Sequence, residues 1–397
     1  MGLFRLLLAI AVLLQHTQGC AYAMTGGAAS VQTFYIISGF LIAMILDAKY
    51  DKPGQLWVFY SNRALRIYST YWLFLLAALF MQLAGHVTVH HSVFDAWRQN
   101  AAGLGPVGSW FLVLSNILIL GQDLTLFLSL DVHGLHWTTS FWHSAPIVPI
   151  FMVIAPAWSL SLELAFYAVA PWILRGRTRW LVTLIVLSLM IRFLLWQAGL
   201  RTDPWSYRFF PNELAMFLSG CLSYRQIYLR LRHRLPSLAS KLFASAVFPA
   251  IILFPLYDRS HGLFFSTAKL LYFLYVICAV PFLFQWTGAF VFDRQLGELS
   301  YPFYLCHFNF VQMLNHNSAR FGTPSRAILG VVISGCAAYL SVLLLERPLD
   351  RFRQSRLRRS QHIADADTNR MRHYAEFPEI DPGKNTLTEP QTDGDSA

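Results

Sequence analysis

The sequence predicts an all-α protein, a polytopic membrane bundle of about ten transmembrane helices with one further re-entrant or interfacial segment. Of its 397 residues, 55% are hydrophobic and only 13% are charged, whereas soluble domains carry about 25% charged residues. Apolar runs of about 20 residues, long enough to cross a hydrocarbon core, recur along the chain. The basic residues gather in alternate loops, which is the pattern that membrane topology requires.

Ten spans are predicted from the apolar windows, at 3–18, 31–48, 69–85, 157–174, 180–199, 208–225, 241–257, 267–287, 299–317 and 324–346. The run at 110–120 is short for a span. Counting it would place the first basic loop and the RGRTR loop at 175–179 on opposite sides of the membrane. It is therefore predicted to be re-entrant or interfacial, and both termini are predicted to be cytoplasmic.

Two domains are predicted, a transmembrane domain at 1–350 and a cytoplasmic tail at 351–397. The tail begins with an arginine-rich run expected to bind anionic lipid, and after about residue 360 it is polar and predicted to be disordered. The net charge of +10 is accounted for by topology, so no nucleic-acid partner is expected. The oligomeric state is left open.

The composition gives no sign of a metal site. The five cysteines lack CxxC spacing, so neither a disulfide framework nor a metal site is predicted. The large outer segment at 86–156 is rich in His and Trp. It has no HxxxH pair on a clear helix with a carboxylate, so a polar-aromatic lid at the membrane interface is expected there.

The first span carries two ionisable side chains, Arg5 and His16. Eleven residues are about three helical turns, so both lie on one face, roughly 16 Å apart. A charge near the bilayer centre costs about 3 kcal/mol, so such residues usually face protein or water. The pair could hold the two ends of an elongated substrate. Equally open are an orientation anchor at Arg5, a packing role for His16, and a cleaved signal peptide.

Arg63 and Arg66 lie at i and i+3, so their guanidinium groups face the same way at the inner membrane surface. Arginine matches phosphate oxygens in bidentate fashion, which makes a phosphate clamp one interpretation. Arg5 is predicted at the same level and could join it. An ordinary positive-inside anchor is the alternative.

The fourth span contains Glu163 within the apolar run, and Ser159, Glu163 and Tyr167 form one polar stripe at i, i+4 and i+8. An intramembrane carboxylate is a candidate for function, although a structural ion pair or a buried protonated glutamate is the alternative. The predicted topology places Glu163 and His16 in the outer leaflet. A carboxylate that orients the imidazole is therefore expected.

The ninth span places three polar side chains, Ser300, Tyr304 and His307, at i, i+4 and i+7. They are expected either to line the same cavity and contact substrate or to form hydrogen bonds between packed helices.

Together these elements resemble the acyltransferase-3 family of integral-membrane acyltransferases. The matching segments follow the family order: Arg5 with His16, FYIISGFLI at 34–42, RALRIYSTYW at 63–72, WSLSLELAFY at 158–167, LGELSYPFYLCH at 296–307 and LLERP at 344–348. The family often has Trp where Cys306 stands and Pro where Ser69 stands. These departures remove none of the expected catalytic groups.

The resemblance implies an inner-membrane enzyme that transfers an acyl group, commonly acetyl, from cytoplasmic acyl-CoA to a hydroxyl of an extracytoplasmic carbohydrate such as O-antigen or exopolysaccharide. It implies that His16 is essential, that Arg5, Arg63 and Arg66 engage the acyl-CoA donor, and that Glu163 matches the glutamate of the WSL segment. Direct transfer and an acyl-histidine intermediate both remain open. The alternative function is a non-enzymatic transporter or flippase with a proton-relay pair of His16 and Glu163, and no inverted repeat with broken helices favours it.

Overall fold

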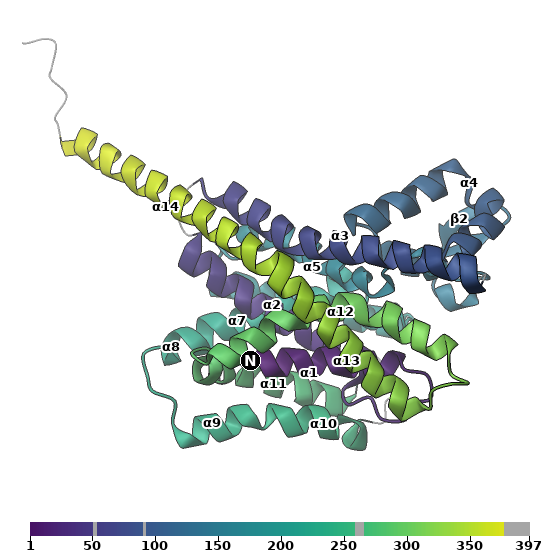
Figure 1. Ribbon diagram of the computed structural model, residues 1–397. Coiled ribbons are helices and arrows are strands. Elements are labelled where there is room, and N and C mark those ends of the chain that lie inside the picture. The colour runs from purple at the N-terminus through teal and green to yellow at the C-terminus, as the bar shows by residue number, and fades with distance from the viewer. Residues whose placement is uncertain (51–53, 90–92, 259–265, 377–397) are drawn as a thin grey trace, which may run out of the picture.

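The computed structural model describes residues 1–50, 54–89, 93–258 and 266–376. It is built almost entirely of helices (Figure 1). The first part of the chain forms α1 (Gly2–His16), α2 (Gly26–Lys49), α3 (Leu56–Val89) and α4 (Val93–Leu118). The second part forms α5 (Trp158–Ile173), α6 (Thr178–Gln197), α7 (Phe210–Ser223) with the π-helical turn Tyr224–Tyr228, α8 (Leu229–Leu231), α9 (Leu238–Ser245) and α10 (Val247–Tyr257).

The last part of the chain forms α11 (Thr267–Thr287), α12 (Val291–His316), α13 (Thr323–Ser341) and α14 (Arg347–Glu376). A π-helical turn at Val342–Glu346 joins α13 to α14, so the two form one long rod that leaves the bundle at the upper left of Figure 1. The helix extends past residue 360 into the segment predicted to be disordered. Of that segment, residues 377–397 lie outside the described residues.

Between α4 and α5 lies an irregular segment. It contains four short 3₁₀ turns, at Asp123–Phe127, Phe141–His143, Val148–Phe151 and Ala155–Ala157, and one antiparallel hairpin of β1 (Leu128–Asp131) and β2 (Gly134–Trp137). The hairpin and α4 occupy the end of the molecule opposite to α8 and the N-terminus (Figure 1). The predicted topology makes this the outer end.

The first helix, α1, lies inside the bundle and runs parallel to α12. At its start the Asp293 carboxylate accepts hydrogen bonds from the backbone N–H groups of Gly2 (2.8 Å) and Leu3 (3.0 Å). At its end the Asn315 side chain donates to the His16 carbonyl oxygen (3.0 Å). The two helices are therefore fixed in register at both ends, which sets the depth of every side chain on α1.

Helices α2 and α7 approach each other closely through two glycines. A Cβ atom at Gly39 would lie 1.8 Å from the Phe217 carbonyl oxygen, and one at Gly220 would lie 1.9 Å from the Ile36 carbonyl oxygen. Only glycine permits this contact between backbones, as is typical of packed membrane helices.

Every one of the ten predicted spans falls on a helix, but the predicted number of spans is not confirmed. Among the described residues, seven helices are long and apolar enough to cross a membrane. One of them is α4, which had not been counted. It bends at Gly105, whose φ of +60° favours glycine, next to Pro106. The 13 residues that follow the bend extend for roughly 20 Å, less than a hydrocarbon core of about 30 Å.

Candidate active site

A cavity of about 130 Å³ lies among α1, α2, α3, α5 and α12. Eight of the ten predicted site residues contribute to its wall: Arg5, Arg63, Arg66, Ser159, Glu163, Tyr167, Ser300 and Tyr304. The other two, His16 and His307, do not line it. Segments that lie far apart in the sequence therefore meet around one narrow space, whose polar residues come from five helices.

The end of the cavity that the predicted topology places on the cytoplasmic side is cationic. Arg5, Arg63 and Arg66 all line it, and they lie close enough to repel one another electrostatically. Within the described parts of the chain, none of the three guanidinium groups forms an ion pair or a side-chain hydrogen bond, and the buried Nε of Arg63 has no partner. Arg63 is only 8% exposed. Because unpaired buried charge is unfavourable, this end of the cavity is suited to an anion.

A fourth arginine near this cluster was not predicted as a site residue. Arg353, on α14, lies within electrostatic range of both Arg63 and Arg66, and it is paired with Asp350 at 3.0 Å. The sequence places it in the arginine-rich run that was interpreted as a lipid anchor. Helix α14 packs against α3, where Arg356 donates to the Ser61 hydroxyl at 3.0 Å. No periodic pattern in the sequence predicts this contact.

Glu163 belongs to the same cationic part of the cavity. Its carboxylate accepts hydrogen bonds from the Ser38 hydroxyl at 2.6 Å and from the Tyr167 hydroxyl. Arg5 and Arg63 lie within electrostatic range of this carboxylate. The carboxylate therefore holds two hydroxyl groups in the wall and partly balances the arginines.

Neutral polar groups also line the cavity. The hydroxyls of Ser159 and Tyr304 lie 2.8 Å apart, which ties α5 to α12. The Ser300 hydroxyl donates to the Gly297 carbonyl oxygen one turn earlier in α12 at 2.8 Å. Ser300 and Tyr304 line the cavity and also form hydrogen bonds within the packed helices. Both expectations for the polar residues of the ninth span therefore hold in part.

Two histidines lie beyond Tyr304. The His16 ring lies 5.6 Å from the His307 ring and 5.0 Å, edge to face, from Phe308. His307 is fully buried, and its Nδ1 lies 2.7 Å from the Tyr304 carbonyl oxygen. Its Nε2 has no hydrogen-bond partner among the described residues. The imidazole that faces His16 is thus held in place by α12.

The expected pairing of His16 with Glu163 does not occur in the structure. His16 lies at the level of His307, which is three residues beyond Tyr304, and Glu163 lies four residues inward from Ser159. At 1.5 Å per residue these offsets place the imidazole and the carboxylate roughly 10 Å apart along the bundle axis. The predicted topology assigns both groups to the outer leaflet. A leaflet is about 15 Å thick, so sharing one does not show that two side chains are in contact.

A second arginine that the sequence analysis missed lies near the histidines. Arg208 stacks over the ring of Trp158 at 4.4 Å and is bound by Asp203 at 2.5 Å. It lies within electrostatic range of His16. Arg208 stands at the start of a predicted span, where an arginine is ordinarily an interfacial anchor. The sequence therefore gave no sign of its place near His16.

The described residues contain no group of three or more His, Cys, Asp or Glu side chains that could hold a metal ion. Of the outer histidines, His133, His136 and His143 are exposed, and His90 and His91 lie outside the described residues. The polar side chains that the described site offers are arginine, histidine, carboxylate and hydroxyl groups.

Comparison with known proteins gives one family match. The family model described as an acyltransferase domain matches residues 1–347. An uncharacterized protein of Aquifex aeolicus (strain VF5) is 27% identical over 205 residues, which make up 52% of this chain and 91% of that protein. No solved structure matches the chain.

Proposed function

Because this chain belongs to the acyltransferase-3 family and is a multi-pass membrane protein, we propose that it transfers an acyl group, expected to be acetyl, from cytoplasmic acyl-CoA to a hydroxyl of an extracytoplasmic carbohydrate. O-antigen and exopolysaccharide are the expected classes of acceptor, and the inner membrane is the expected location. One observation carries the proposal. Three guanidinium groups that form no ion pair or side-chain hydrogen bond among the described residues stand at one end of a narrow cavity whose other end approaches two histidines.

The cationic end suits the phosphates of the donor. Arginine forks form two parallel hydrogen bonds to a phosphate, and such charge-assisted bonds are roughly twice as strong as neutral ones. Arg5, Arg63 and Arg66 would bind the nucleotide end of acyl-CoA, with Arg353 close behind them. The small volume of the cavity, about 130 Å³, suits the thin thioester-bearing arm that would extend outward toward Tyr304.

His16 is the proposed general base. It would accept the proton from the sugar hydroxyl while the oxygen attacks the thioester carbonyl carbon. The carbon–sulfur bond then breaks, and the CoA thiolate takes up the proton that His16 has received. Atoms and charge balance without a metal or a redox partner. An acyl group carried on His16 itself would give the same products through two steps.

Glu163 has a different role from the one expected. It lies too far from His16 to orient the imidazole, so we assign it to positioning Ser38 and Tyr167 beside the donor arm and to balancing Arg5 and Arg63 before the donor binds. The ring beside His16 is instead that of His307, which is fixed through the Tyr304 carbonyl oxygen.

The experiment that tests this function compares His16→Ala with the wild-type protein in the same membranes. Release of free CoA thiol and the mass of the surface glycan are measured, and membrane insertion is checked by protease protection. His16→Ala should insert normally and release no thiol. His133→Ala is the matched control, because His133 is exposed in the outer hairpin. Full acylation by His16→Ala would end the proposal, and a wild-type protein that releases no thiol would favour a transporter.

A further inference from the structure

A second, larger cavity of about 470 Å³ lies near the outer end of the molecule. Its wall combines the outer segment with the loop that enters α7: Asp123, Leu124, Phe127, Trp137, Thr138, Thr139, Trp205, Phe209, Phe210 and Pro211. Ligand pockets in proteins typically measure about 300–1,000 Å³, and they combine apolar surface with a few fixed polar groups. By contrast, the inner cavity is too narrow for a sugar ring in addition to the donor arm.

We propose that this outer cavity binds a sugar ring of the acceptor polysaccharide, stacked on Trp137 and Trp205 with its hydroxyls directed to Asp123. This inference rests on the proposed function. The ring in the outer cavity would be a neighbour of the one that is acylated, since the cavity is separate from the histidine pair.

Trp205 offers a flat face that is already fixed. The Trp205 indole N–H donates to the Thr139 carbonyl oxygen at 2.8 Å, and its ring packs against Phe127 (4.9 Å) and Phe209 (5.4 Å). Trp137, on the hairpin, lines the same cavity and is 71% exposed. Side chains that are ordered before binding lose little conformational entropy when a ligand stacks on them.

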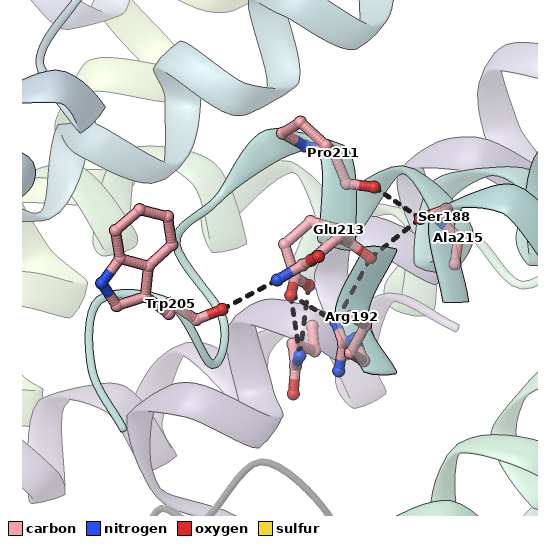
Figure 2. A network of polar contacts seen from close by, with 8 residues as sticks. Ser188, Arg192, Trp205, Pro211, Glu213 and Ala215 are labelled. Atoms are coloured by element: carbon pink, nitrogen blue, oxygen red, sulfur yellow. Dashed lines mark hydrogen bonds and ion pairs between the residues drawn. The ribbon is translucent and has the colours of Figure 1, made fainter. Parts of the chain in front are cut away.

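The loop that carries Trp205 is anchored by a buried polar network behind the cavity (Figure 2). The Asn212 side chain donates to the Trp205 carbonyl oxygen at 2.9 Å. Next along the chain, the fully buried Glu213 pairs with Arg192 at 2.6 Å and accepts from Gln32 at 3.1 Å. A charge pair that is buried and hydrogen-bonded holds one backbone arrangement, because any other arrangement would leave a charge without its partner.

The polar group of the cavity is Asp123. One of its oxygens accepts from the Ser161 hydroxyl at 2.6 Å. Burial raises the pKa of the Asp123 carboxyl, and the hydrogen bond from Ser161 offsets part of that rise. A partly buried carboxylate is a strong acceptor for hydroxyl donors. Threonine hydroxyls at 138 and 139 add further donors and acceptors to the same wall.

The outer cavity lies beside the proposed route of transfer. Ser161 contacts Asp123, whereas Ser159, about 200° further around α5, contacts Tyr304 of the inner cavity. The first turn of α5 therefore stands between the two cavities. The loop before α7 also lies between the two regions. Trp205 lines the outer cavity, whereas Arg208 lies over Trp158 and within electrostatic range of His16.

The test titrates the full-length protein in nanodiscs with polysaccharide extracted from a strain that lacks the gene, in the presence of acetyl-CoA. Initial rates of CoA thiol release give the half-saturating polysaccharide concentration. Trp137→Ala should raise that concentration at least tenfold while the KM for acetyl-CoA stays within twofold. Trp137→Phe, which keeps an aromatic face, should stay within threefold of wild type. Trp142→Ala is the matched control, because Trp142 is 58% exposed in the same segment and does not line the cavity.

An unchanged half-saturating concentration in Trp137→Ala would overturn the inference, as would a parallel rise in the KM for acetyl-CoA, which would indicate a structural effect. If binding of spin-labelled phosphatidylethanolamine changes instead, the cavity is a lipid site and the inference is wrong. A wild-type protein whose thiol release does not respond to polysaccharide refutes the proposed acceptor itself, and the inference then fails with it.

Discussion

Removal of Arg63 gives the most direct test of the donor site. Arg63 is 8% exposed and its Nε has no partner in the described chain, so the side chain is suited to binding an anion. A hydrogen bond to a charged group contributes about 1.5–3 kcal/mol, and each 1.4 kcal/mol is tenfold in affinity. Arg63→Ala should therefore weaken acyl-CoA binding by roughly 10- to 150-fold, measured by calorimetric titration in detergent.

The reasoning also predicts which ligand is unaffected. S-acetylpantetheine carries the thioester arm without the nucleotide phosphates, so its affinity for Arg63→Ala should equal its affinity for the wild-type protein. The protein without donor should melt at the same temperature or higher, because a buried unpaired charge has been removed. Arg177→Ala is the matched control, since Arg177 is exposed in another predicted cytoplasmic loop. Equal loss of affinity for both ligands, or no loss for acyl-CoA, would refute the phosphate clamp.

Three further substitutions follow from contacts in the structure. Arg353→Ala should weaken acyl-CoA binding by less than Arg63→Ala, because the Arg353 guanidinium is already paired with Asp350. A loss of affinity as large as that of Arg63→Ala in the same titration would contradict this. Arg192→Ala should lower stability by about 3–5 kcal/mol, because Glu213 is left buried without its cation, and thermal unfolding should show partial recovery when Glu213→Gln is added. Gly220→Ala should destabilise by about 1–3 kcal/mol or more through overpacking, whereas Gly335→Ala, with no atom within 4 Å, should not.

The arginine cluster could be predicted from the sequence because topology fixes the level of charged residues at the membrane surface. Arg5 and the pair Arg63 and Arg66 are set near the inner surface by the positive-inside rule, and the i, i+3 spacing sets the direction of the pair. The structure places all three on one cavity. Their role in binding the donor stays a prediction.

The surroundings of His16 could not be predicted, because they depend on the axial register between helices. The register of α1 against α12 is set by Asp293 and Asn315, which contact the backbone at the two ends of α1. Neither residue has a sequence signal that identifies its partner. A shift of one turn, about 5.4 Å, would change which side chains of α12 meet the imidazole.

The outer cavity depends on contacts that no periodic pattern contains. Trp205 and Trp137 are 68 positions apart. The Trp205 indole N–H donates to the Thr139 carbonyl oxygen, and its ring packs against Phe127 at the end of the first 3₁₀ turn. The sequence predicted an aromatic lid from composition alone. It did not show that the loop before α7 packs against that segment, since Trp205 and Phe209 flank a predicted span boundary.

The two cavities differ in a way that fits the two substrates of one transfer reaction. The inner cavity is narrow and cationic, and its unpaired arginines favour an anionic ligand that enters from the predicted cytoplasmic side. The outer cavity is wider, is lined by aromatic rings and carries one carboxylate, so it favours a neutral, hydroxyl-rich ligand and repels phosphate. Exchanging the ligands would place phosphate beside Asp123 and bury the three guanidinium groups against neutral sugar, which is unfavourable at both sites. Under the proposed function, the charge distribution therefore favours the donor at the inner cavity and the acceptor at the outer cavity.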